Sequence, residues 1–221
     1  MKSANAPSDV PGKRAYNQGA RARAAELTAG RILDVFARRI RDDWLDQITL
    51  DQIAQEADVT VPTVVRHFGG KDGLLAAVQR RTAGEIHARR RIAPGDVQGA
   101  LAALIDDYEA AGDLVMRVLS QEERHAPFKA MADEGRREHR AWIAGIFAPW
   151  LDSLDAAARQ ARLDALVVAT DLYVWKLLRR DMGRTPAETR ALMSTLVTAA
   201  IGPLPLTPPA SHAPAQEPRH D

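Results

Sequence analysis

The sequence predicts an all-α protein, and three observations support that class. Ala and Leu dominate a hydrophobic content of 46%, whereas aromatic residues make up only 5%, a balance that favours helices over a β-sandwich. Apolar residues recur at a spacing near 3.6, and we find no alternation typical of strands. At 221 residues the chain has room for one domain or two small ones.

Composition excludes several classes of function. The chain has no cysteine, which removes disulfides, iron–sulfur clusters, thiol catalysis and cysteine-based zinc sites. It has no run of about 18 apolar residues, and its polar start lacks the apolar segment of a signal peptide. We therefore expect a cytoplasmic protein. The sequence also has no glycine-rich phosphate loop, nucleophile elbow or metal-binding pair with full spacing, so we expect no enzyme, no cofactor and no metal.

Charge is unevenly distributed along the chain although the net charge is only +1. Residues 1–92 carry 16 Lys and Arg against 11 Asp and Glu, whereas residues 93–221 carry 14 against 18. The excess of basic residues in the first segment favours contact with phosphates, whereas the acidic second segment is expected to have a function other than binding phosphates. Chance clustering in a helical protein is the alternative interpretation.

The first expected helix covers about residues 21–41, because Ile32, Phe36 and Ile40 share one apolar face. Residues 1–20 have no apolar periodicity, and we expect a flexible basic arm there. Lys13 and Arg14, together with Arg21 and Arg23 just after the arm, are expected to reach phosphates or the minor groove, and a solubilising tail is the alternative.

Two short helices follow. Thr49 with Gln52 has capping-box spacing, which predicts the start of one helix. Asp58 tolerates the left-handed backbone of a tight turn, and Thr60 is the expected cap of the next helix, with Pro62 in its first turn.

Gly69-Gly70 ends that helix, and another runs from Lys71 to about Arg91. Pro94-Gly95 marks the expected domain boundary. The helices expected beyond it cover about residues 96–111, 114–125, 127–154, 158–182 and 186–200, and the third of these is expected to bend near Pro149. A Pro-rich tail from residue 202 is expected to be disordered.

Residues 49–68, TLDQIAQEADVTVPTVVRHF, have the pattern of a helix-turn-helix. Ala54 is small where the two helices touch, and Val59, Val64 and Phe68 face the core. The outward face of the second helix, which can then enter a major groove, consists of Val61, Pro62, Thr63, Val65, Arg66 and His67.

The segment resembles the tetracycline-repressor (TetR) family of bacterial transcription regulators. The resemblance covers about residues 23–85 and is carried by TLDQIAQEA, VTVPTVVRHF and GKDGLL. Two positions depart from the family pattern: Asp58 stands where members usually have Gly, and Val65 replaces a Tyr that normally contacts the DNA backbone.

The resemblance implies an N-terminal three-helix helix-turn-helix domain over residues 21–92 and a larger helical effector-binding and dimerisation domain over residues 93–201. It implies a repressor that a small molecule releases from its operator. A DNA-binding protein without an effector is an open alternative.

By position in the motif, Thr49 and Lys71 would contact phosphates. Val61, Pro62, Thr63 and His67 would face bases, and Arg66 would reach bases or backbone. The full set of expected DNA contacts is Thr49, Thr60, Val61, Pro62, Thr63, Val65, Arg66, His67 and Lys71.

Effector contacts are expected from large or polar side chains of the second domain, in competition with ordinary core packing. These candidates are Tyr108, Met116, His125, Trp142, Phe147, Asp171 and Trp175. Glu122 and His125 also form a Glu-x-x-His, which leaves a helical-bundle metalloenzyme as a second alternative.

The last two expected helices predict a homodimer. Helix 158–182 carries one apolar stripe through Leu163 and Leu166 and another through Val168, and helix 186–200 has a similar excess. A four-helix bundle about a two-fold axis covers both stripes, and such a dimer reads an inverted repeat.

Overall fold

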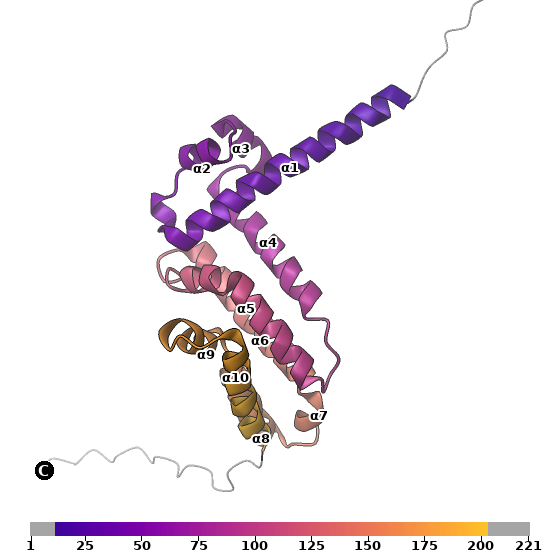
Figure 1. Cartoon of the computed structure of the whole chain (residues 1–221), viewed down its shortest axis with the longest axis vertical. Coiled ribbons are helices and arrows are strands. Elements are labelled where there is room, and N and C mark those ends of the chain that lie inside the picture. Colours follow the sequence, from indigo (N-terminus) through magenta and orange to yellow (C-terminus); the bar gives the residue numbers. More distant parts are fainter. Residues whose placement is uncertain (1–11, 203–221) are drawn as a thin grey trace, which may run out of the picture. The chain divides into compact units, whose positions relative to one another are not determined.

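The computed structural model describes residues 12–202, and within this range helices are the only regular secondary structure (Figure 1). The all-α prediction is confirmed. The described residues group into two compact units, one of residues 12–92 with 102–139 and the other of residues 93–101 with 140–202. The expected division of functions at residue 92 stays a prediction.

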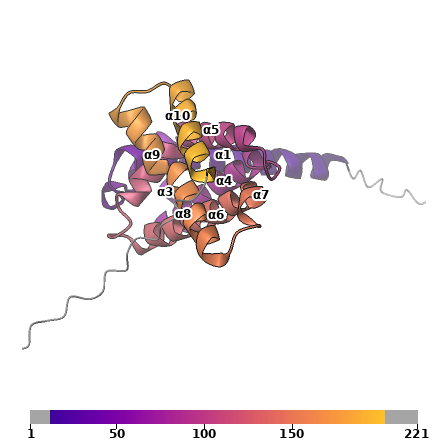
Figure 2. The same ribbon diagram turned by 90° about the horizontal axis from the view of Figure 1, so that it is seen from below.

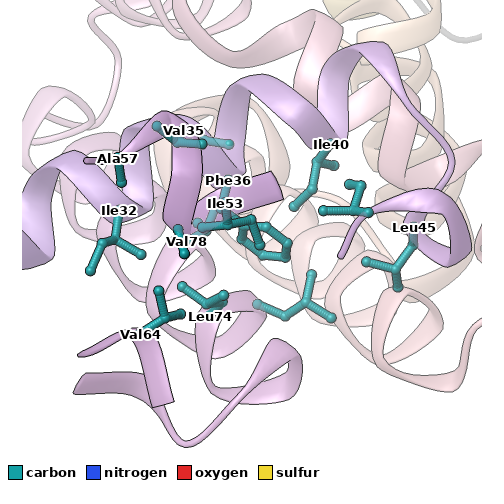
Figure 3. Packing of buried hydrophobic residues seen from close by; sticks show 14 of the residues in the cluster. Ile32, Val35, Phe36, Ile40, Leu45, Ile53, Ala57, Val64, Leu74 and Val78 are labelled. Atoms are coloured by element: carbon teal, nitrogen blue, oxygen red, sulfur yellow. The ribbon is translucent and has the colours of Figure 1, made fainter. Parts of the chain in front are cut away.

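The first unit begins with five helical elements: α1 (Gly12–Asp42), the short 3-10 helix η1 (Leu45–Gln47), α2 (Leu50–Glu56), α3 (Val61–Phe68) and α4 (Lys71–Arg89). Their apolar faces meet in one core, in which Ile32 and Phe36 of α1, Ile53 of α2, Val64 of α3 and Leu74 of α4 are fully buried (Figure 3). This core fixes the position of α3 against three other helices.

Helix α1 begins well before residue 21, so the prediction of a flexible arm is wrong for residues 12–20. This stretch includes the good helix formers Lys13, Arg14, Ala15, Gln18 and Ala20. A helix that extends from a packed segment also needs no new nucleus. Residues 1–11 lie outside the described part of the chain, as does the expected Pro-rich tail from residue 203 onward.

Two further helices contribute to the first unit, α5 (Val97–Leu119) and α6 (Ala126–Ile146). The break predicted between the helices over 96–111 and 114–125 is wrong, because α5 runs through Gly112. Gly costs a helix only about 1 kcal/mol, and packing of Leu114 and Val118 against the core outweighs that cost. Helix α6 ends at Ile146 rather than bending at Pro149, and the short α7 (Ala148–Leu151) follows it.

The second unit contains α8 (Ala156–Ala169), α9 (Leu172–Lys176), the π-helical turn η2 (Leu177–Asp181) and α10 (Pro186–Ile201). Helix α10 packs on α8 (Figure 2). The prediction of a single helix over 158–182 is wrong, because the helix breaks at Thr170 and Asp171. The Thr170 hydroxyl donates to the Leu166 carbonyl at 2.8 Å, and the Asp171 carboxylate accepts from the Tyr173 amide at 2.8 Å. Asp171 therefore starts a new helix.

Across residues 12–202, none of the helices is both long and apolar enough to cross a bilayer.

Candidate nucleic-acid interface

Helix α2 begins with the capping box that the sequence predicts. The Thr49 hydroxyl accepts a hydrogen bond from the Gln52 amide at 3.2 Å, and the Gln52 side-chain oxygen accepts one from the Thr49 amide at 2.9 Å. The Thr49 side chain is exposed, and its hydroxyl proton stays available to an acceptor outside the protein.

The turn between α2 and α3 requires a left-handed residue, and Asp58 supplies it with φ of 53°. The Val59 amide then donates back to the Ala54 carbonyl at 2.9 Å, which closes the turn. Asp in place of Gly therefore preserves the helix-turn-helix backbone.

Helix α3 exposes both polar and apolar side chains to solvent. Val64 is fully buried, whereas Pro62, Arg66 and Val65 are exposed, the last with 43% of its surface accessible. Val61, which we expected on the outward face, is partly buried and packs against the core. The side chains offered to a groove are therefore fewer than the sequence suggests.

The Thr60 side chain does not cap α3, contrary to expectation. Its hydroxyl pairs with the Thr63 hydroxyl at 3.0 Å across the first turn. Each hydroxyl carries one proton and two acceptor sites, so this pair retains hydrogen-bonding capacity toward an outside partner.

His67 lies at the other end of α3, partly exposed, with its ring 6.0 Å from that of Phe68. Gly69 ends the helix in the left-handed region at φ 75°, and Gly70 follows at φ 137°.

Lys71 opens α4 and has a protein partner that the sequence did not predict. Its Nζ donates to the Leu45 carbonyl at 3.0 Å. An ammonium group has three donors, so Lys71 holds the α1–α2 connection and keeps two protons for another acceptor.

Residues from α5 and the segment after it support the α1–α2 connection, and sequence reasoning missed them. The buried Gln121 accepts from the Leu45 amide at 2.9 Å, and Arg117 donates to the Asp43 carbonyl at 3.4 Å. The guanidinium groups of Arg117 and Arg124 lie 4.5 and 5.2 Å from the centre of the Trp44 ring. Partners this far apart in the chain leave no local signal in a sequence.

Ion pairs join α1 to α2. Glu56 accepts from Arg38 and Arg39, and Arg39 also binds Asp43 at 2.8 Å. The hydrogen bond from Arg38, followed by the one from Arg39, lowers the pKa of Glu56 from its ordinary value of 4.5.

A second ion-pair group joins the end of α4 to α5. Asp107 is only 1% exposed and accepts from Arg90 at 2.7 Å and from Arg89. A carboxylate this buried requires charged partners. Because both partners of Asp107 lie at the end of α4, the ion pairs hold that end against α5.

The seven residues that were expected to contact an effector do not all belong to one unit. Tyr108, Met116 and His125 belong to the first unit, and the other four belong to the second. Of the latter, Phe147 and Trp175 are buried, the Trp175 ring lies under Arg180, and Asp171 caps α9. The effector residues stay a prediction.

The two residues behind the metalloenzyme alternative have separate partners. Glu122 binds Arg136 at 2.7 Å, and His125 Nε2 lies 3.6 Å from the Asp46 carboxylate. Within residues 12–202, no group of three or more His, Asp or Glu side chains is arranged to hold a metal ion.

Comparison with known proteins points to one family. Residues 45–78, from η1 to the middle of α4, match the family of bacterial regulatory proteins named tetR. The HTH-type transcriptional regulator BetI of Burkholderia ambifaria is 28% identical over 179 residues, 76% of this chain and 89% of the relative. BetI of Burkholderia mallei is 26% identical with the same coverage.

Solved structures share the fold. A transcriptional regulator from Rhodococcus sp. Rha1 superposes with a TM-score of 0.61 at 15% identity, over 78% of this chain and 95% of that one. A tetR-family transcriptional regulator from Streptomyces coelicolor gives 0.60 at 17% identity, over 79% and 82%.

Proposed function

We propose that this chain represses transcription in the cytoplasm by binding an inverted-repeat operator as a homodimer. The chain belongs to the TetR family and is therefore a DNA-binding transcriptional regulator. The observation that carries the proposal is α3, held by a buried core and presenting Arg66, Val65 and Pro62 outward. A helix held in this way can enter the major groove without rearrangement.

We assign the DNA contacts by the chemistry that each side chain still offers. Thr49 and Lys71 contact phosphates with their free protons, one before and one after α3 in the chain. Arg66, Thr63 and His67 contact base edges, and the exposed Val65 and Pro62 contact thymine methyl groups. Thr60 assists Thr63 through their paired hydroxyls, and Val61 supports α3 from the core.

Exposed apolar side chains on the second unit support the homodimer. Val168 on α8 is 64% exposed, and Leu192 and Leu196 on α10 are also exposed, whereas Met193 and Val197 of α10 are buried. One stripe of α10 is thus used inside the protomer and another is left uncovered, as expected of helices that form a bundle with a second copy.

A small-molecule effector that releases the operator is typical of the family. Such a ligand has to bind the DNA-free state more tightly than the DNA-bound state, and it then weakens DNA binding by the same factor. The candidate contacts are those expected from the sequence, among them Tyr108, Trp142 and Trp175.

An Arg66→Ala variant tests the α3 assignment, with Arg80→Ala on the exposed side of α4 as the matched control. On a duplex selected by the wild-type protein, we expect Arg66→Ala to cost about 1–3 kcal/mol and to reduce discrimination between sequences. Arg80→Ala should bind as the wild type does. Equal affinity of both variants for the selected duplex contradicts the assignment of α3 as the reading helix.

Light scattering at micromolar concentration tests the dimer. The wild type should have the mass of two chains, and Leu196→Arg should shift it toward one. A monomeric wild type that protects a single half-site contradicts the proposal.

A further inference from the structure

The N-terminal half of α1 extends beyond the core of the unit to which it belongs. Among the side chains of α1 that the structure describes, the first buried one is that of Ile32, which lies on the same side of the core as Val64 of α3 (Figure 3). From there toward Gly12 the helix continues past α3 and away from α2, α3 and α4 (Figure 1). Arg21 through Leu27 are exposed, and Leu27 has 71% of its surface accessible.

This half-helix is strongly basic. Between residues 12 and 31 the sequence places five cationic residues and one acidic residue, Glu26. Arg21, Arg23 and Arg31 are exposed, and none of the three forms an ion pair with a described residue. At about 100° per residue, Arg21, Arg23 and Arg31 fall within one half of the helix circumference and Glu26 within the other. The cationic positions are Lys13, Arg14, Arg21, Arg23 and Arg31.

The length of the extension matches the repeat of duplex DNA. Residues 12–31 span about 30 Å as a helix, close to the rise of one turn of B-DNA, about 34 Å. A helix that is surrounded by solvent is stabilised little by the burial of apolar surface. Its cationic side chains bind most favourably beside phosphates, because binding there releases the counterions condensed on DNA.

We propose that residues 12–31 of α1 form a second DNA-binding element, which contacts the phosphate backbone of double-stranded DNA outside the half-site that α3 reads. The proposal rests on the proposed function, because α3 must first place the protein on the duplex. The element adds affinity and a longer footprint and reads no bases, because arginine contacts to phosphates carry no sequence information.

The double variant Arg21→Gln/Arg23→Gln tests the element, with Arg80→Gln/Arg91→Gln as a control that removes two exposed positive charges at and beyond α4. Each protein is titrated against two duplexes. The short duplex holds only the selected inverted repeat, and the long one adds about ten base pairs of arbitrary sequence on each side. Thermal unfolding of all three proteins confirms that the exposed substitutions leave the fold intact.

We expect Arg21→Gln/Arg23→Gln to bind the short duplex as the wild type does and the long duplex about tenfold more weakly. Because each protomer then has two fewer arginines at the phosphates, the log–log salt slope on the long duplex should fall by about two to four. The footprint on the long duplex should shorten on both sides.

Equal affinity of the two double variants for the long duplex overturns the inference while leaving the proposed function intact. Loss of binding to vesicles of anionic phosphatidylglycerol, with DNA binding unchanged, also overturns it in favour of a lipid surface. Failure of the wild type to bind either duplex counts instead against the proposed function.

Discussion

Gly73 is the position at which a single added carbon should cost most. It lies in the first turn of α4, and a Cβ there would overlap the Phe68 carbonyl oxygen and lie 2.8 Å from the Phe68 carbonyl carbon. Both atoms belong to the backbone at the end of α3, so no side-chain rotation relieves the clash. The close approach of α4 to the end of α3 therefore requires glycine.

The expected magnitude follows from two opposing effects. Overpacking costs about 1–3 kcal/mol and occasionally more, and a clash with backbone belongs at the upper end. The better helix propensity of Ala returns at most about 1 kcal/mol. We expect Gly73→Ala to lose about 2 kcal/mol or more, which for a chain of this length lowers Tm by about 4–8 °C.

Gly84→Ala is the matched control, because Gly84 lies in the same helix, is exposed, and has no atom within 4 Å of the added Cβ. It should gain about 0.5–1 kcal/mol. Thermal unfolding followed by far-UV circular dichroism compares the three proteins. A Gly73→Ala variant that is as stable as the wild type refutes the claim that glycine fixes the α3–α4 junction.

Three other predictions concern the supports of the helix-turn-helix. Asp107→Asn should destabilise the protein by about 1–3 kcal/mol in urea unfolding, because Arg89 and Arg90 lose a buried acceptor, and unchanged stability argues against that role. Glu56 has a lowered pKa, so its stabilising effect is complete above pH 4.5 and is lost as the pH falls through the pKa of the folded state. The stability difference between wild type and Glu56→Gln should therefore be present at pH 7 and shrink below pH 4.5, and a difference that grows in acid contradicts the pairing. Gln121→Leu should weaken DNA binding by loosening the Leu45 connection, as measured by titration of the selected duplex, and wild-type affinity contradicts that link.

The sequence predicted those features that depend on neighbouring residues. The capping box at Thr49 is confirmed, and Asp58 has the left-handed backbone expected of the turn. The start of a helix at Pro186 is confirmed as well, with a capping box in which Glu188 accepts from the Thr185 amide at 2.8 Å. Each is decided within three or four residues, so each leaves a readable pattern.

Two errors show where local signals compete with packing and with each other. Gly112 predicts a break, yet α5 continues because packing of the helix outweighs the propensity cost. Asp171 falls inside a predicted long helix, yet its carboxylate caps a new helix.

The supports around the interface could not be predicted in this way. Gln121 and Arg117 reach the α1–α2 connection from α5 and the segment after it, and Asp107 pairs with residues at the end of α4. These contacts depend on how distant helices pack, which periodicity and capping do not encode. For the same reason, Val61 was expected to face outward although it packs against the core.

DNA reading by α3 is tested most sharply by selecting bound sequences from random duplex DNA with the purified full-length chain and footprinting the best site. We expect enrichment of an inverted repeat whose half-sites lie on one face of the duplex, and loss of that enrichment with Arg66→Ala. Recovery of no preferred sequence, or of the same repeat with Arg66→Ala, contradicts the assignment of this chain's specificity to α3.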